Sequence, residues 1–228
     1  HLRAVLGGST NVNDIDWTLE RYPHLVSFDV PSADVNGTHL SRLPPRITQL
    51  TLFNALWEEA SPPLDHLPPH LTRFTGLQVT ENGSKLPRTL TSADLQVCSL
   101  ADLNALPQGL TTLSVSDSQV HDFSTLPLTS LEIGPRNVEA TKFSLALRVL
   151  RLETLSSAVL ALLPANLTSL TFVHMEHHDY ARLPRCLRQI HWKPSQQSSA
   201  ACVELSASSC LAHLPRTLTE YRADPLVS

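Results

Sequence analysis

The residues whose types could bind a metal ion lie in one short run, His174-Met-Glu-His177-His178-Asp179. Imidazole nitrogens and carboxylate oxygens are common metal ligands. The order of these residues differs from the helical HExxH pattern, in which two histidines share one face of a helix. The run also follows an expected strand, Thr171–Val173, and so falls where a turn is expected. We therefore interpret it as a polar turn and expect no metal site and no cofactor.

The chain carries none of the short motifs that mark common catalytic sites. It has no GxSxG, no phosphate-binding loop and no GxGxxG, and no two carboxylates are spaced for acid–base work. Serine, histidine and aspartate are scattered along its length. We expect no catalytic residues, no small-molecule substrate and no enzyme activity.

Composition indicates a folded, aliphatic protein. Of 228 residues, 42% are hydrophobic and only 5% aromatic, and the formal net charge is −4. A negative chain argues against a dedicated nucleic-acid binder, which needs a concentrated basic surface. The four cysteines form no CxxC pair, which favours reduced thiols over a zinc site or a disulfide framework.

Sequence signals for membranes and secretion are weak. No apolar run approaches the roughly 18 residues of a membrane helix. Three N-x-S/T triplets, at Asn36, Asn82 and Asn166, are close to chance for a chain this rich in serine and threonine. We expect an intracellular protein, cytoplasmic or organellar, with no membrane contact; secretion is the alternative.

The elements that would position any functional side chain are internal repeats. Seven copies begin with leucine-proline, at Leu43, Leu67, Leu86, Leu106, Leu163, Leu183 and Leu214. Three residues after each proline stands an apolar residue, here called the marker. Together with the equivalent residues of copies that lack a proline at this offset, the markers are Leu25, Ile47, Leu71, Leu90, Leu110, Leu128, Leu147, Leu167, Leu187 and Leu218. Pro127 is displaced toward its marker, and Ser144 stands where other copies have proline.

Each copy predicts one short strand followed by a return path. Apolar residues three and five positions after the marker point to the same face of a strand. Parallel strands need a crossover, and about 20 residues leave room only for an extended or one-turn return. Proline fixes φ just before the strand. Since no copy can bury its own apolar edge, the copies must stack on their neighbours.

The repeat register divides the chain into four segments. Residues 1–24 are expected to form an N-terminal cap or degenerate repeat, and residues 25–193 the repeats. Residues 194–212 are expected to be an insertion loop. Residues 213–228 are expected to form the last repeat and the C-terminal edge.

Copies such as Leu106-Pro-Gln-Gly-Leu-Thr-Thr-Leu-Ser-Val115 resemble leucine-rich repeats of the LPxxLxxLxL kind. They are similar to the LPX repeats of bacterial YopM and IpaH effectors and to LP-rich repeats of kinetoplastid and slime-mould proteins. The resemblance implies an α/β repeat solenoid, a horseshoe with a parallel concave sheet and a mostly extended or one-turn convex side, that binds proteins. Such repeats usually place a buried asparagine eight residues after the first leucine of the copy's L-x-x-L-x-L core. Here that position holds Ala55, Val79, Cys98, Ser118, Arg136, Leu155 and Met175, so we expect irregular turns after the strands.

Strand residues that point away from the core are the candidates for binding. Arginine and aromatic side chains often anchor interfaces, and charged groups add specificity. The concave candidates are Phe53, Arg73, Asp94, Glu132, Arg151, Glu153, His191 and Arg222. A second set, arginines beside the repeat proline, is expected along one edge: Arg46, Arg88, Arg185 and Arg216.

These features favour a non-catalytic scaffold that binds a protein partner through the concave face or an edge. One alternative is a structural subunit of a large ribonucleoprotein, such as an organellar ribosome or an assembly intermediate. RNA would then be a partner only within the larger complex. A second alternative is a secreted effector or receptor ectodomain.

Overall fold

The computed structural model describes residues 2–5, 18, 20–30, 37–52, 64–79, 85–98, 105–118, 122–136, 142–175, 180–192 and 214–223. The chain forms two compact units, His1–Val120 and His121–Ser228. This division falls inside the segment 25–193 that the sequence assigns to repeats. The units are described separately below as unit 1 and unit 2.

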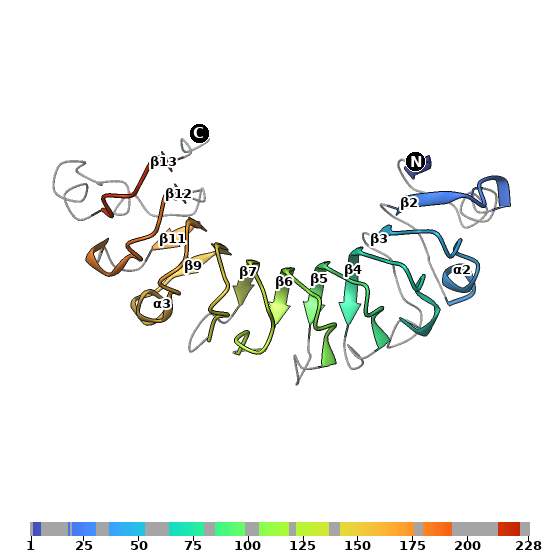
Figure 1. Ribbon diagram of the computed structural model, residues 1–228, viewed down its shortest axis with the longest axis horizontal. Coiled ribbons are helices and arrows are strands. Elements are labelled where there is room, and N and C mark those ends of the chain that lie inside the picture. Colours follow the sequence, from blue (N-terminus) through green and yellow to red (C-terminus); the bar gives the residue numbers. More distant parts are fainter. Residues whose placement is uncertain are drawn as a thin grey trace. The chain divides into compact units, whose positions relative to one another are not determined.

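Unit 1 contains a parallel sheet whose strands follow chain order (Figure 1). Its strands are β1 (Leu2–Val5), β2 (Leu25–Val30), β3 (Gln49–Leu52), β4 (Arg73–Val79), β5 (Ser92–Cys98) and β6 (Thr112–Ser118). The pairing keeps equivalent residues of successive copies opposite one another, as in Leu50, Phe74, Ala93 and Leu113. The predicted parallel stacking of copies is therefore confirmed in this unit.

Unit 2 repeats the arrangement. Its main strands are β7 (Ser130–Arg136), β8 (Val149–Leu152), β10 (Ser169–Phe172), β12 (Gln189–Trp192) and β13 (Glu220–Ala223), again parallel and in chain order. A small second sheet pairs β9 (Thr154–Leu155) with β11 (His174–Met175).

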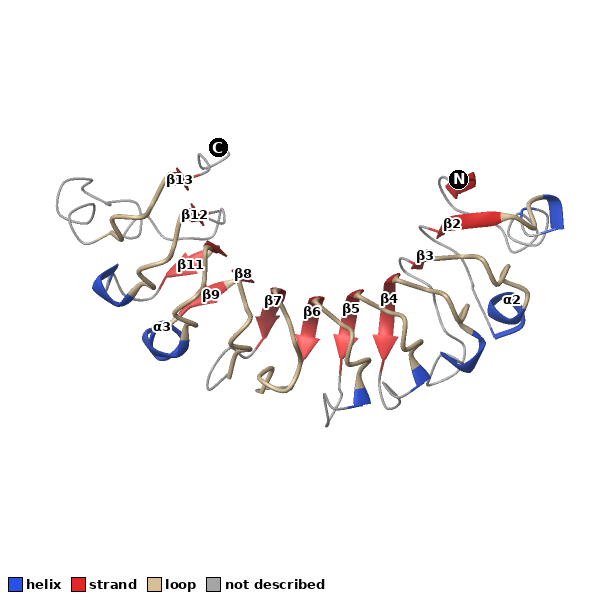
Figure 2. Ribbon diagram, in the orientation of Figure 1, coloured by secondary structure: helices blue, strands red, loops and turns tan. Residues whose placement is uncertain are grey.

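The return segments are short, as the repeat length predicts. In each unit the described helices lie on one side of the sheet and leave the other side, here called the open face, uncovered (Figure 2). In unit 1 they are α2 (Gly37–Ser41) and the 3-10 turn η1 (Leu64–His66). In unit 2 they are α3 (Ser157–Leu162) and the 3-10 turn η4 (Tyr180–Arg182). The Ser156 hydroxyl caps α3 by accepting the Val159 N–H at 3.3 Å.

The leucine-proline turn has the same geometry in nearly every described copy. The proline carbonyl accepts the marker N–H three residues on, for example Pro68 to Leu71 at 3.1 Å and Pro164 to Leu167 at 3.0 Å. Ser144 closes the same turn with the Leu147 N–H at 3.1 Å. The proline is thus replaceable here, because the bond uses its carbonyl and not its missing N–H.

Threonine links successive turns. Seven of the ten residues that directly follow a marker are threonine: Thr48, Thr72, Thr91, Thr111, Thr129, Thr168 and Thr219. The Thr72 carbonyl accepts the N–H of Thr91 at 3.0 Å, the N–H of Ser92 at 3.1 Å and the Thr91 hydroxyl at 3.1 Å. Arg148, at the same position in unit 2, presents its carbonyl to both the hydroxyl and the N–H of Thr168. We call this repeating contact the threonine ladder.

The markers form the centre of the core in both units. From Leu25 to Leu187 every marker is 0% exposed. Packing is complementary around Phe74, whose neighbour on β5 is the small Ala93. A Cβ placed on Gly76 would lie 2.4 Å from Phe74 Cζ, so the ring occupies space that a side chain fills in other copies.

The missing asparagine ladder has two structural outcomes. In unit 1, β4, β5 and β6 run through the asparagine position, at Val79, Cys98 and Ser118. In unit 2, β7 also runs through this position, at Arg136. By contrast, β8 and β10 end three residues before it, and after a break of one residue the chain re-forms β9 and β11, with Leu155 fully buried. The expected irregularity is therefore a one-residue break after β8 and after β10, whereas β4 to β7 continue as extended strands through the asparagine position.

Candidate binding surfaces

The open face of each sheet is the face that points away from the marker leucines. In unit 1 it is built from the first and third residue of each strand from β3 to β6, and from Ser27 and Asp29 of β2. The register aligns Ser27, Gln49, Arg73, Ser92 and Thr112 in one row, and Asp29, Thr51, Thr75, Asp94 and Ser114 in the next. These side chains are half-buried or exposed and polar throughout. Unit 1 therefore presents a polar surface rich in hydroxyl side chains.

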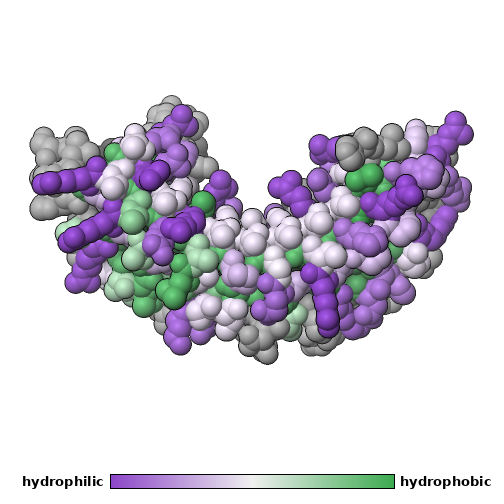
Figure 3. Space-filling model, in the orientation of Figure 1, coloured by the Kyte–Doolittle hydropathy of each residue, from purple (hydrophilic) through white to green (hydrophobic). Residues whose placement is uncertain are grey.

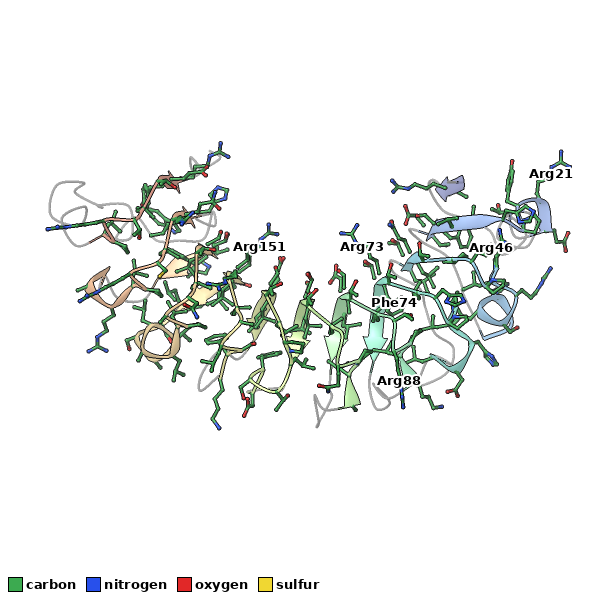
Figure 4. All side chains as sticks on the ribbon, viewed as in Figure 1. Arg21, Arg46, Arg73, Phe74, Arg88 and Arg151 are labelled. Atoms are coloured by element: carbon green, nitrogen blue, oxygen red, sulfur yellow. The ribbon has the colours of Figure 1, made fainter. Side chains whose placement is uncertain are left out.

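Two charged candidates belong to this surface. Arg73 is exposed at the start of β4 and projects from the sheet (Figure 4), whereas Asp94 is half-buried on β5. At the other end of the surface, Arg3 Nη2 lies 2.6 Å from Asp29 Oδ2. Phe53, also predicted for this face, lies outside the described residues.

The open face of unit 2 is more highly charged. One row aligns Glu132, Arg151, Thr171, His191 and Arg222, and its neighbour aligns Ser130, Val149, Ser169, Gln189 and Glu220. The structure thus brings four of the predicted residues into one row.

Ion pairs within this face join acids to arginines. Arg151 Nη1 lies 3.3 Å from Glu132 Oε2, and Arg222 Nε lies 3.3 Å from Glu220 Oε1. Gln189 Nε2 donates to Glu220 Oε2 at 3.0 Å. All four charged side chains are more than 40% exposed, so each pair contributes little to stability and remains available to a partner.

Glu153 is placed differently from its predicted companions. It occupies the bend between β8 and β9 and is half-buried. Its carbonyl accepts the N–H groups of Val173 at 3.0 Å and His174 at 2.7 Å. Its backbone therefore connects the bend after β8 to the equivalent bend after β10 by hydrogen bonds.

The second predicted set lies at the turns that precede the strands. We call these ten five-residue segments the turn edge: 22–26, 44–48, 68–72, 87–91 and 107–111 in unit 1, and 125–129, 144–148, 164–168, 184–188 and 215–219 in unit 2. Arg46 and Arg88 of unit 1 and Arg185 and Arg216 of unit 2 are all exposed there. In unit 1, Arg88 lies on the opposite side of its repeat from Arg73 (Figure 4).

Sequence reasoning missed two more arginines of the turn edge. Arg148 and Arg188 replace the ladder threonine directly after the markers Leu147 and Leu187, and both are exposed. Arg148 Nη1 donates to the Asn166 carbonyl at 3.1 Å. Alignment of all ten turns, rather than of the prolines alone, would have found them.

The sequence run around His174 gives no metal site among the residues the structure describes. His174 lies in β11, and residues 176–179 fall outside the described ranges. Within those ranges no three histidine, cysteine or carboxylate side chains gather as a metal would require. None of the described helices is long and apolar enough to span a membrane.

The pKa of Asp122, in unit 2, is lowered by its neighbours. The hydroxyl and N–H of Ser124 both donate to Asp122, and Lys142 Nζ lies 3.5 Å from it. The hydrogen bond from the Ser124 hydroxyl is the main cause that lowers the pKa of Asp122 below its usual 3.8, with the Ser124 N–H and Lys142 acting in the same direction. This cluster closes a turn beside the bridge between Asp122 and Lys142 and is structural.

Together, parallel strands, buried markers and proline turns define each unit as a solenoid of the leucine-rich-repeat type. No protein-family model matches the chain, and no curated protein matches it in sequence. Among solved structures, an internalin from Listeria monocytogenes is similar to it, with 17% sequence identity and a TM-score of 0.48. That similarity covers 91% of this chain, which spans 56% of the internalin chain.

Proposed function

We propose that the chain is a non-catalytic scaffold that binds a protein partner through the open face of its sheet. The observation that carries this proposal is the open face itself. It presents successive rows of polar and charged side chains at strand spacing, and no described helix covers it. A rigid parallel sheet holds such side chains at fixed distances, which reduces the entropy lost on binding.

The open faces of the two units differ in chemical character and suit different roles in binding. The small hydroxyl side chains of unit 1 permit close approach of a partner's backbone, and the charges of unit 2 favour one orientation over another. Arg73 and Arg151, which project from the sheets of their respective units, are the anchors we expect to contribute most (Figure 4).

The experiment is capture of partners by the full chain, compared with variants that block the open face. Thr75→Arg and Thr171→Arg place a large charged side chain at the centre of this face in unit 1 and in unit 2. Gln108→Arg adds the same group to an exposed turn and serves as the control. We expect a partner that the native chain and the control retain and that one or both open-face variants lose. Equal retention by all four proteins contradicts the proposal.

We also propose that the protein acts inside the cell and that its repeats are most similar to the LPX type. An exposed free thiol at Cys186 supports a reducing environment. Asn166, part of one N-x-S/T triplet, offers an exposed test position. Mass spectrometry of the protein from its source should find Asn166 unmodified; a glycan there contradicts intracellular location.

A further inference from the structure

The turn edge contains no carboxylate. Its ten five-residue segments hold fifty residues, all of them described, and none is aspartate or glutamate. With 21 acidic residues in 228, four or five would be expected there by chance. The same segments carry six arginines: Arg46, Arg88, Arg148, Arg185, Arg188 and Arg216. A chain of net charge −4 therefore keeps one edge wholly free of negative side chains.

In unit 2 four of these arginines come together. Arg148, Arg185, Arg188 and Arg216 belong to the turns before β8, β12 and β13, and β10 lies between β8 and β12. Three strand spacings of about 4.8 Å place all four turns within about 14 Å along the sheet. The first acidic residue beyond the last turn is Glu220, on the open face, where it already pairs with Arg222.

Exposed apolar side chains lie in the turn edge of unit 2 and beside it. Leu145 is 85% exposed in the turn before β8, and Leu162 at the end of α3 is 42% exposed. Ala146, Ala161 and Ala165 beside them are also exposed. Figure 3 shows apolar surface over the region of α3 and β9, next to hydrophilic projections. Leu145 lies largely outside the core, and nothing in the turn geometry requires an aliphatic side chain at that position.

We propose that the turn edge of unit 2 binds an acidic polypeptide segment that also carries an apolar side chain. Guanidinium groups pair with carboxylates in a two-point geometry, and the apolar side chain would cover Leu145. RNA fits less well, because exposed leucine and alanine gain nothing from phosphates. The turn segments of unit 2 also contain no aromatic residue on which a base could stack. This surface is separate from the open face and does not depend on the function proposed for it.

The test is selection of short peptides on the immobilised full chain. One random pool is built from Asp, Glu, Leu, Phe and Ser, a second replaces the acids by Lys, and a third consists of short single-stranded RNA. We expect peptides from the acidic pool alone to be enriched, each with several carboxylates and at least one apolar residue. Their affinity should fall as salt rises.

Variants locate the binding site. Arg185→Glu with Arg188→Glu should weaken the enriched peptides by about tenfold or more, and Leu145→Ser by about threefold. Arg88→Glu, the same turn position in unit 1, is the matched control and should leave binding within about twofold. Thr171→Arg on the open face should also have no effect, so the two proposals can fail separately. The inference is overturned if the acidic pool is not enriched, if the Arg185/Arg188 variant binds normally, or if the RNA pool is retained through these arginines.

Discussion

The contact between Phe74 and Gly76 allows a quantitative test of how the repeats pack. Gly76→Ala places a methyl group 2.4 Å from Phe74 Cζ, closer than atoms can approach, while Phe74 is only 4% exposed and has little room to move. Overpacking of this kind costs about 1–3 kcal/mol, offset by about 0.5–1 kcal/mol from removing a strand glycine. We expect Gly76→Ala to lower the free energy of unfolding by about 1–2 kcal/mol.

A second substitution isolates the cause. Phe74→Leu alone removes buried ring atoms and should cost about 1–2 kcal/mol. In the double variant the alanine methyl fills space that the ring has left, so its loss should be smaller than the sum of the single losses by about 1 kcal/mol or more. Urea unfolding followed by circular dichroism measures all four proteins.

Gly109→Ala is the control for the glycine itself. A Cβ there would lie 3.7 Å from the Leu90 carbonyl oxygen, an ordinary contact, so this variant should be neutral or more stable by up to about 1 kcal/mol. Losses at Gly76 and Phe74 that add within about 0.5 kcal/mol would refute the packing argument.

Three further predictions concern the turns. Thr91→Val removes the hydroxyl bond to Thr72 and should cost about 0.5–1.5 kcal/mol in urea unfolding, whereas Thr112→Val on the open face should change little; equal losses would contradict the ladder. Ser144→Pro should keep the turn and destabilise by no more than about 1 kcal/mol, since the Leu147 N–H bonds to a carbonyl that proline also has; a larger loss argues against interchangeable turns. Because the pKa of Asp122 is lowered in the fold, its contribution to stability is present above its unfolded pKa of about 3.9 and is lost as pH falls through the folded value. Asp122→Asn should therefore reduce the loss of stability on acidification, measured by thermal unfolding at successive pH values, and an unchanged pH profile would show that the Ser124 bonds do not matter.

The sequence predicts the repeat and its core well, because both depend on local spacing. Markers identified from the leucine-proline register are completely buried from Leu25 to Leu187, and the strands after them pair in parallel. A two-residue alternation decides which face of a strand is buried, and that alternation is visible in the sequence.

Contacts between copies were harder to predict. Threonine after the marker was visible in seven copies, but its bond to the previous carbonyl depends on the register of two strands. The match between the large Phe74 ring and the small residues Gly76 and Ala93 likewise involves two successive copies. The residues predicted for the open face follow from alternation, yet which acid pairs with which arginine, as in Glu132 and Arg151, depends on neighbouring copies.

Site-specific photo-cross-linking would show whether a protein partner binds at the open face. A photoreactive amino acid would replace Thr75, Ser114 or Thr171 on the open face, and Ala158 on the outside of α3, in the full chain within its own cells. If the partner binds there, the open-face positions should give a cross-linked protein of one defined mass and Ala158 should give none. Cross-links from Ala158 with none from the open face would contradict it.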